Sequence, residues 1–138
     1  MSRTVLIVED DALSMKLTRD VLEAYGFSTR ECGDGREAVA TAVSTGADLI
    51  VMDIGLPGMD GIEATRLLKQ NPLTKGIPVI AVTAFAMPDD ERRMRDAGCD
   101  AFLTKPLRLQ DLVAAVQGLI GGAPGGEEAP RGGARRPA

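Results

Sequence analysis

The fold of this chain follows from residues 48–53, DLIVMD, where a continuous apolar run leads directly to the carboxylate of Asp53. Such a run is typical of a strand buried on both faces of a sheet, because a strand with one solvated face alternates apolar and polar residues. Breakers follow at once in residues 54–61, IGLPGMDG, so the strand ends there. A carboxylate at the mouth of a buried strand needs a partner or a function to offset its burial.

Further short runs rich in apolar or β-branched residues lie on both sides of this stretch. We predict strands at about residues 4–8, 28–32, 48–52, 78–82 and 101–104. They alternate with amphipathic stretches, and this alternation indicates parallel strands joined by helical crossovers. The fold class is therefore α/β: a doubly wound, five-stranded parallel sheet with helices on both faces.

The stretches between the strands have the periodicity of helices. The first carries apolar residues at helical spacing, Leu13, Leu17, Val21 and Ala24. The others are expected from just after residue 35 to about 46, from about residue 61, and over residues 88–98 and 109–120. The helix at 88–98 has a thin apolar face, essentially Met94 and Ala97, so we expect it to be the most loosely held.

One folded domain is predicted over residues 1–120, because a chain of this length suits a single core. Residues 121–138 are rich in Gly, Pro and Arg and contain no large apolar side chain. Such a segment cannot bury enough surface to fold, so we predict a disordered tail.

Composition excludes several functional classes. The chain has no histidine, which excludes Ser-His-Asp and Cys-His catalysis, histidine zinc sites and a histidine phosphocarrier role. Its net charge of -4 argues against nucleic acid as the main partner. Its 2 cysteines are too few for a disulfide framework. With no membrane span or signal peptide visible in the sequence, we expect a cytoplasmic protein without a membrane partner.

Polar side chains follow four of the predicted strands, at the edge where doubly wound sheets bind ligands. They are Glu9, Asp10, Asp53, Thr83 and Lys105. Three carboxylates brought together at one edge either bind a cation or repel one another. The alternative is that the acids are ordinary helix N-cap residues.

The ordered set of motifs resembles the receiver domain of two-component response regulators. The matching stretches are VEDD at 8–11, MD at 52–53, LPGMDG at 56–61, TA at 83–84 and FLTKP at 102–106. The resemblance spans about residues 3–120 and is strongest to stand-alone, single-domain cell-cycle regulators. It implies a flavodoxin-like receiver fold with strand order 2-1-3-4-5.

The resemblance also implies roles for individual residues. Asp53 would be the phosphoacceptor, assisted by Thr83 and Lys105, and Thr83 and Phe102 would form the conformational switch. The peptide bond between Lys105 and Pro106 is usually cis in such domains.

A cofactor is implied as well. Mg²⁺ would be held by Glu9, Asp10 and Asp53, with the carbonyl of Gly55 completing the protein's ligands. Magnesium suits such a site because it takes few carboxylates, keeps water molecules and accepts phosphate oxygens.

The implied function is that of a single-domain response regulator. It would accept a phosphoryl group from a histidine kinase or a histidine phosphotransfer protein. It would then signal to a downstream regulatory protein through the surface of its fourth helix, fifth strand and fifth helix. It would not be an enzyme, and it would be a monomer or a weak dimer. Gly55 and Phe85 occupy positions where family members often carry polar side chains that orient the hydrolytic water, so we expect slow self-dephosphorylation.

Two other functions stay open at this point. An aspartate-nucleophile phosphatase expects an Asp-x-Asp motif, whereas Asp53 is followed by Ile54 and Gly55. A nucleotide- or flavin-binding module of similar topology expects a Gly-rich loop after the first strand, and none is present there.

Overall fold

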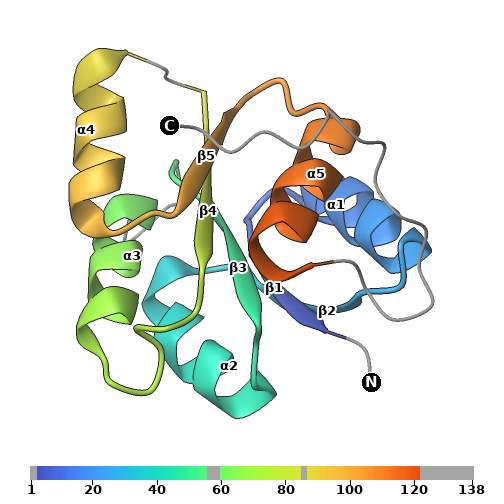
Figure 1. The fold of residues 1–138 in the computed structure, drawn as a ribbon, viewed down its shortest axis with the longest axis horizontal. Helices are drawn as coiled ribbons and strands as arrows, with labels where there is room; N and C mark the ends of the chain where they lie inside the picture. The colour runs from blue at the N-terminus through green and yellow to red at the C-terminus, as the bar shows by residue number, and fades with distance from the viewer. Residues whose placement is uncertain (1–2, 56–59, 85–86, 122–138) are drawn as a thin grey trace.

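A computed structural model describes residues 3–55, 60–84 and 87–121 of the chain (Figure 1). Its elements are β1 (Thr4–Val8), α1 (Ala12–Ala24), β2 (Ser28–Cys32), the 3-10 turn η1 (Gly35–Glu37), α2 (Ala38–Thr45), β3 (Leu49–Asp53), α3 (Gly61–Gln70), β4 (Val79–Thr83), α4 (Pro88–Ala97), β5 (Ala101–Thr104) and α5 (Leu109–Ile120). The strands form one parallel sheet in the order β2-β1-β3-β4-β5, which confirms the predicted fold class and strand order. Across the described ranges, no helix combines the length and the apolar character that a membrane crossing requires.

The sheet separates two apolar cores, one on each face. Along β1, Val5 and Ile7 pack with α1 and α5, while Leu6 and Val8 pack with α2 and α3. Figure 1 shows the same division, with α4 on the side of α2 and α3. Because successive side chains point to opposite faces, a strand between two cores must be apolar throughout. This explains the continuous apolar runs.

Strands β3 and β4 end one residue later than predicted. Asp53 is the last residue of β3, where it pairs with Val82, and the Ile54 amide donates to the Val82 carbonyl at 3.0 Å. At the other end, Asp48 lies outside the strand and exchanges two bonds with Thr4, each of 2.8 Å. Hydrogen bonding, rather than the apolar run, therefore sets the ends of the strand, and Thr83 likewise closes β4.

Helix α1 does not bury all of the apolar residues that recur along it at helical spacing. Leu13 and Leu17 are 64% and 48% exposed, whereas Met15, Thr18 and Leu22 are buried. Both sets have helical spacing, so periodicity alone does not distinguish them. The helix at these residues was predicted correctly, but Leu13 and Leu17 lie on its exposed side.

Lys69, near the end of α3, ties together the end of the sheet where β4 and β5 begin. Its Nζ donates to the Ile77 carbonyl at 2.8 Å and to the Asp100 carboxylate at 3.0 Å. The same Asp100 oxygen accepts the Val79 amide at 2.8 Å. The lysine stem crosses Gly98, whose φ is +108° and where a Cβ would lie 2.6 Å from Lys69 Cγ. Only glycine fits this helix end without displacing the lysine.

Candidate functional site

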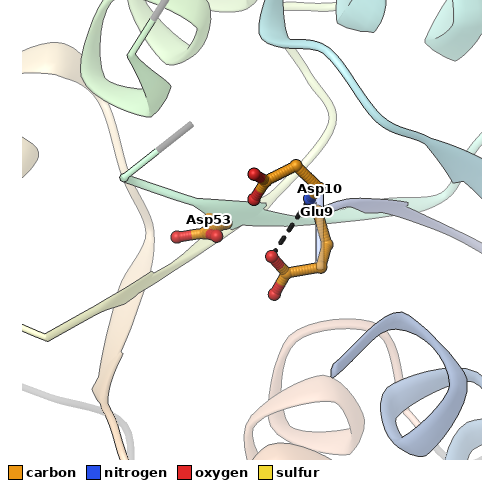
Figure 2. Close-up of side chains that lie close together, drawn as sticks. All are labelled: Glu9, Asp10 and Asp53. Carbon is orange, nitrogen blue, oxygen red and sulfur yellow. Dashed lines mark hydrogen bonds between the residues drawn. The ribbon is translucent and has the colours of Figure 1, made fainter. Parts of the chain in front are cut away.

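Three carboxylates gather at the carboxyl ends of two neighbouring strands. Glu9 and Asp10 follow β1, and Asp53 ends β3, which pairs with β1. Each offers an oxygen that lies within 4.8 Å of the other two (Figure 2). This convergence was predicted from the strand ends alone.

Asp53 is a buried carboxylate whose position is fixed by its neighbours. It is only 5% exposed. Its Oδ1 accepts the Gly55 amide at 3.0 Å and lies 3.3 Å from Lys105 Nζ. The Lys105–Pro106 peptide bond is cis, as expected. Asp53 is therefore both oriented and partly neutralised, which offsets part of the cost of its burial.

Glu9 is half-buried beside this charge. Burial raises the pKa of Glu9 to about 7, and the adjacent Asp53 carboxylate acts in the same direction. One Glu9 oxygen accepts the amides of Asp10 and Asp11 at 3.1 and 3.2 Å. The raised pKa of Glu9 thus reflects burial first and the neighbouring negative charge second, and a bound cation would favour the ionised carboxylate.

The N-cap alternative is wrong for all three acids of the cluster. The residue that caps α1 is Asp11, which accepts the Ser14 amide at 2.8 Å. The residue that caps α3 is Asp60, which accepts the Glu63 amide at 2.9 Å. Glu9, Asp10 and Asp53 therefore need a different explanation.

An open cleft of about 370 Å³ collects the predicted site residues. Its lining includes Glu9, Asp10, Asp53, Gly55, Thr83 and Lys105. Thr83 is 3% exposed at the end of β4. Every residue assigned to phosphoryl transfer or metal binding from the sequence thus borders one cavity.

Phe102 is the exception among the predicted residues, because it lies beside the cleft rather than in its lining. It is partly buried on β5 against the small core that includes Met94 and Ala97 of α4. The guanidinium of Arg95 lies 5.8 Å from the centre of its ring, a cation–π distance. Phe102 thus contacts the helix assigned to the signalling surface.

Three charged residues of the cleft were not predicted as site residues: Asp11, Asp60 and Arg93. Asp60 stands inside a matched motif, and its position one residue before a helix was the signal available. Arg93 lies on α4, where a charged side chain is normally solvated, so its sequence context carried no signal.

The donor set fits magnesium. Glu9, Asp10 and Asp53 supply hard carboxylate oxygens, and the cluster carries more negative charge than Lys105 alone offsets. Mg²⁺ prefers such ligands and accepts a site with only a few of them.

Comparison with known proteins gives consistent matches. The family model for the response regulator receiver domain matches residues 5–117. The polar-differentiation response regulator DivK of Brucella ovis is 45% identical over 123 residues, which are 89% of this chain and 100% of that protein.

Solved structures agree with the sequence matches. A putative response regulator from Chloroflexus aurantiacus superposes with a TM-score of 0.82 at 31% identity, covering 87% of this chain and 98% of that one. The receiver domain of the sensor histidine kinase PA1611 from Pseudomonas aeruginosa, solved with a magnesium ion in its active-site cleft, gives 0.80 at 31% identity over 88% and 99%. A family model that spans β1 to α5, and a relative aligned over its whole length, make this chain a member of the response regulator receiver domain family.

Proposed function

We propose that this chain is a single-domain response regulator of a phosphorelay that accepts a phosphoryl group on Asp53. The observation that carries the proposal is a buried carboxylate, held by Gly55 and Lys105, that borders an open cleft. The donor is the phosphohistidine of a histidine kinase or of a histidine phosphotransfer protein. The chain lacks histidine and therefore cannot supply that donor itself.

The chemistry is a displacement at phosphorus. A carboxylate oxygen of Asp53 attacks the phosphorus atom, the bond from phosphorus to the donor's imidazole nitrogen breaks, and that nitrogen keeps the electron pair and takes a proton from solvent. Lys105 then pairs with an oxygen of the transferred group, and the Thr83 hydroxyl donates to another. Both side chains border the cleft that Asp53 faces.

Glu9, Asp10 and Asp53, with the carbonyl of Gly55, would hold the Mg²⁺ ion of this site. The bound ion supplies charge that stabilises the transferring phosphoryl group. Without it, the three carboxylates disfavour an incoming anion. The protein's own contribution is to hold them within 4.8 Å of one another on two adjacent strands.

The signal leaves through protein contact at the surface of α4, β5 and α5, with Thr83 and Phe102 as its switch. The position of Phe102 supports this, because its ring packs against α4 residues Met94 and Ala97. A change at Thr83, on the strand that pairs with β5, reaches Phe102 over a short path. We regard the chain as a signalling domain rather than an enzyme, as a monomer or weak dimer, and as cytoplasmic.

Leu17, an exposed apolar residue of α1, supports a protein as the phosphoryl donor. Leu17 also lines a second cleft, of about 270 Å³, together with Asp53 and Lys105. Exposed apolar side chains beside a reacting group mark a surface where another protein docks. The net charge of -4 argues against nucleic acid as the partner that docks here.

We propose residues 1–120 as the receiver domain and residues 121–138 as a disordered tail; beyond residue 121 this segment lies outside the described residues. We also propose that the phosphoryl group is lost slowly. Gly55 has no side chain with which to orient a water molecule. Phe85, the second residue behind that proposal, lies outside the described residues.

The decisive experiment is phosphorylation with acetyl phosphate and Mg²⁺, followed by mass spectrometry of the intact protein. Wild type gains one phosphoryl group and Asp53→Asn gains none, while the control Asp20→Asn, an exposed acid paired with Lys16, behaves as wild type. An equal gain in the wild type and Asp53→Asn contradicts the proposal. Steady turnover of p-nitrophenyl phosphate would favour the aspartate-nucleophile phosphatase instead.

A further inference from the structure

Helix α4 brings a second cationic side chain to the cleft of Asp53. Arg93 borders this cleft together with Asp53 and Lys105, although it lies on a different element from either of them. Among the described residues, no hydrogen bond or ion pair involves Arg93. Arg93 is also exposed, so its guanidinium is accessible to an anion that enters the cleft.

The other two arginines of α4 have different surroundings. Arg92 lies 3.9 Å from Asp89 on the outer surface of the helix and does not border the cleft. Arg95 lies over the ring of Phe102. The three arginines thus have separate environments, and Arg92 provides a control with the same charge, the same helix and the same sequence neighbourhood as Arg93.

Charge balance favours a second cation once the site carries a phosphoryl group. Lys105 lies 3.3 Å from the Asp53 carboxylate and offsets its one negative charge. A phosphoryl group leaves more negative charge on the same side chain and adds several acceptor oxygens. An arginine can pair two of its N–H groups with two phosphate oxygens, which a lysine cannot do with the same fixed geometry.

On the basis of the phosphorylation of Asp53 proposed above, we propose that Arg93 is a second cationic ligand of the phosphoryl group and that it ties helix α4 to the phosphorylated site. In the unphosphorylated protein the same guanidinium repels a divalent cation held by Glu9, Asp10 and Asp53. Arg93 therefore opposes metal binding and favours the phosphoryl group.

This assignment gives α4 a direct contact with the phosphoryl charge. Met94, the next residue, is one of the two α4 residues that are buried. An attraction between Arg93 and the phosphoryl group therefore acts next to Met94, one of the residues that hold the helix in the core. The path is separate from the one through Thr83 and Phe102, and both lead to the same helix.

Isothermal titration calorimetry tests this proposal by measuring the affinities for a cation and for an anion on the same variants. The probes are Mg²⁺ alone, and then beryllofluoride, which binds carboxylates as an analogue of the phosphoryl group, at saturating Mg²⁺. The variants are Arg93→Gln, Arg93→Lys and the control Arg92→Gln. We expect Arg93→Gln to bind Mg²⁺ about 2-fold more tightly and beryllofluoride roughly 10-fold more weakly. Arg93→Lys should bind beryllofluoride with an affinity between those of Arg93→Gln and wild type, because it keeps the charge but loses the paired contact. Arg92→Gln should match wild type.

The affinities for Mg²⁺ and for beryllofluoride are expected to change in opposite directions, which distinguishes this role of Arg93 from a purely structural one. A damaged fold lowers both affinities, so a loss of both in Arg93→Gln overturns the inference, as does a result equal to that of Arg92→Gln. In either case wild type still binds beryllofluoride and Asp53→Asn does not, so the proposed function stands. If wild type fails to bind beryllofluoride at saturating Mg²⁺, the proposed function fails and this inference falls with it.

Discussion

Gly61 occupies a position with no room for an added methyl group. A Cβ at this residue would lie 2.5 Å from the Asp53 carbonyl oxygen and 2.7 Å from Ile54 Cα, both backbone atoms. Ordinary contact begins at 3.4 Å, so the start of α3 would have to move by about 0.9 Å. The Gly61 amide also donates to the Ile54 carbonyl at 3.0 Å, and this movement would weaken that bond.

The cost of Gly61→Ala follows from these contacts. Overpacking against rigid backbone costs about 1–3 kcal/mol, and the weakened hydrogen bond costs up to about 1 kcal/mol. The helix preference of alanine over glycine returns up to about 1 kcal/mol. We expect the free energy of unfolding to fall by about 2 kcal/mol, which moves the midpoint of urea denaturation down by roughly 1 M.

The matched control is Gly76→Ala. A Cβ at Gly76 would meet no atom within 4 Å, and its backbone lies outside the left-handed region. This change should leave stability unaltered or raise it by about 0.4–1 kcal/mol, because alanine restricts the unfolded chain. Urea denaturation followed by far-UV circular dichroism measures both variants. Equal midpoints for the two variants would refute the reasoning.

Three further outcomes are expected. The folded state holds a proton on Glu9 up to about pH 7 and the unfolded state only up to about 4.5, so this carboxyl lowers stability as pH rises through that window. With a chelator present, Glu9→Gln should therefore stabilise the protein by roughly 1 kcal/mol more at pH 8 than at pH 5 in urea denaturation. The same stability difference between variant and wild type at both pH values would contradict the raised pKa of Glu9. At Gly55 a Cβ would lie in ordinary contact, 3.8 Å from Asp53 Oδ1, so Gly55→Asn fits and should speed loss of the phosphoryl group by roughly tenfold through orienting water. Intact mass against time measures this, and an unchanged lifetime would argue against the assigned cause of slow loss. Leu22→Ala should cost about 3 kcal/mol while Leu13→Ala stays within about 0.5 kcal/mol, since the first is fully buried and the second mostly exposed. Similar losses for the two variants in thermal unfolding would contradict the burial described for α1.

Most of the fold was predictable because its signals are local. Continuous apolar runs report burial on both faces, and Gly and Pro mark where each run stops. The errors arose where a longer-range interaction decides the outcome. Asp53 belongs to β3 because its neighbour's amide bonds to Val82 on another strand. The buried face of α1 depends on where the helix lies on the sheet, which two interleaved stripes of similar spacing do not reveal.

The candidate site was predictable to the extent that topology determines it. Parallel strands bring their carboxyl ends to one edge, so Glu9, Asp10, Asp53 and Thr83 had to converge there. Arg93 does not follow from topology, because its place at the cleft depends on how α4 packs. That packing rests on Met94 and Ala97, and the apolar pattern of the helix does not indicate where the neighbouring Arg93 side chain lies.

The close contact between Lys69 and Gly98 determines which end of helix α4 is held most firmly. It clamps the last turn of α4 to α3 and to the starts of β4 and β5, at the pole of the sheet opposite Asp53. Helix α4 has 10 residues and so measures about 15 Å. A pivot of about 10° at the clamped turn would move the other end of α4 by roughly 2–3 Å. Amide exchange should accordingly slow along α4 from residue 91 towards residue 97, and a uniform rate would contradict this arrangement. The contact between Lys69 and Gly98 therefore leaves the N-terminal end of α4 as the end that would move most in such a rotation.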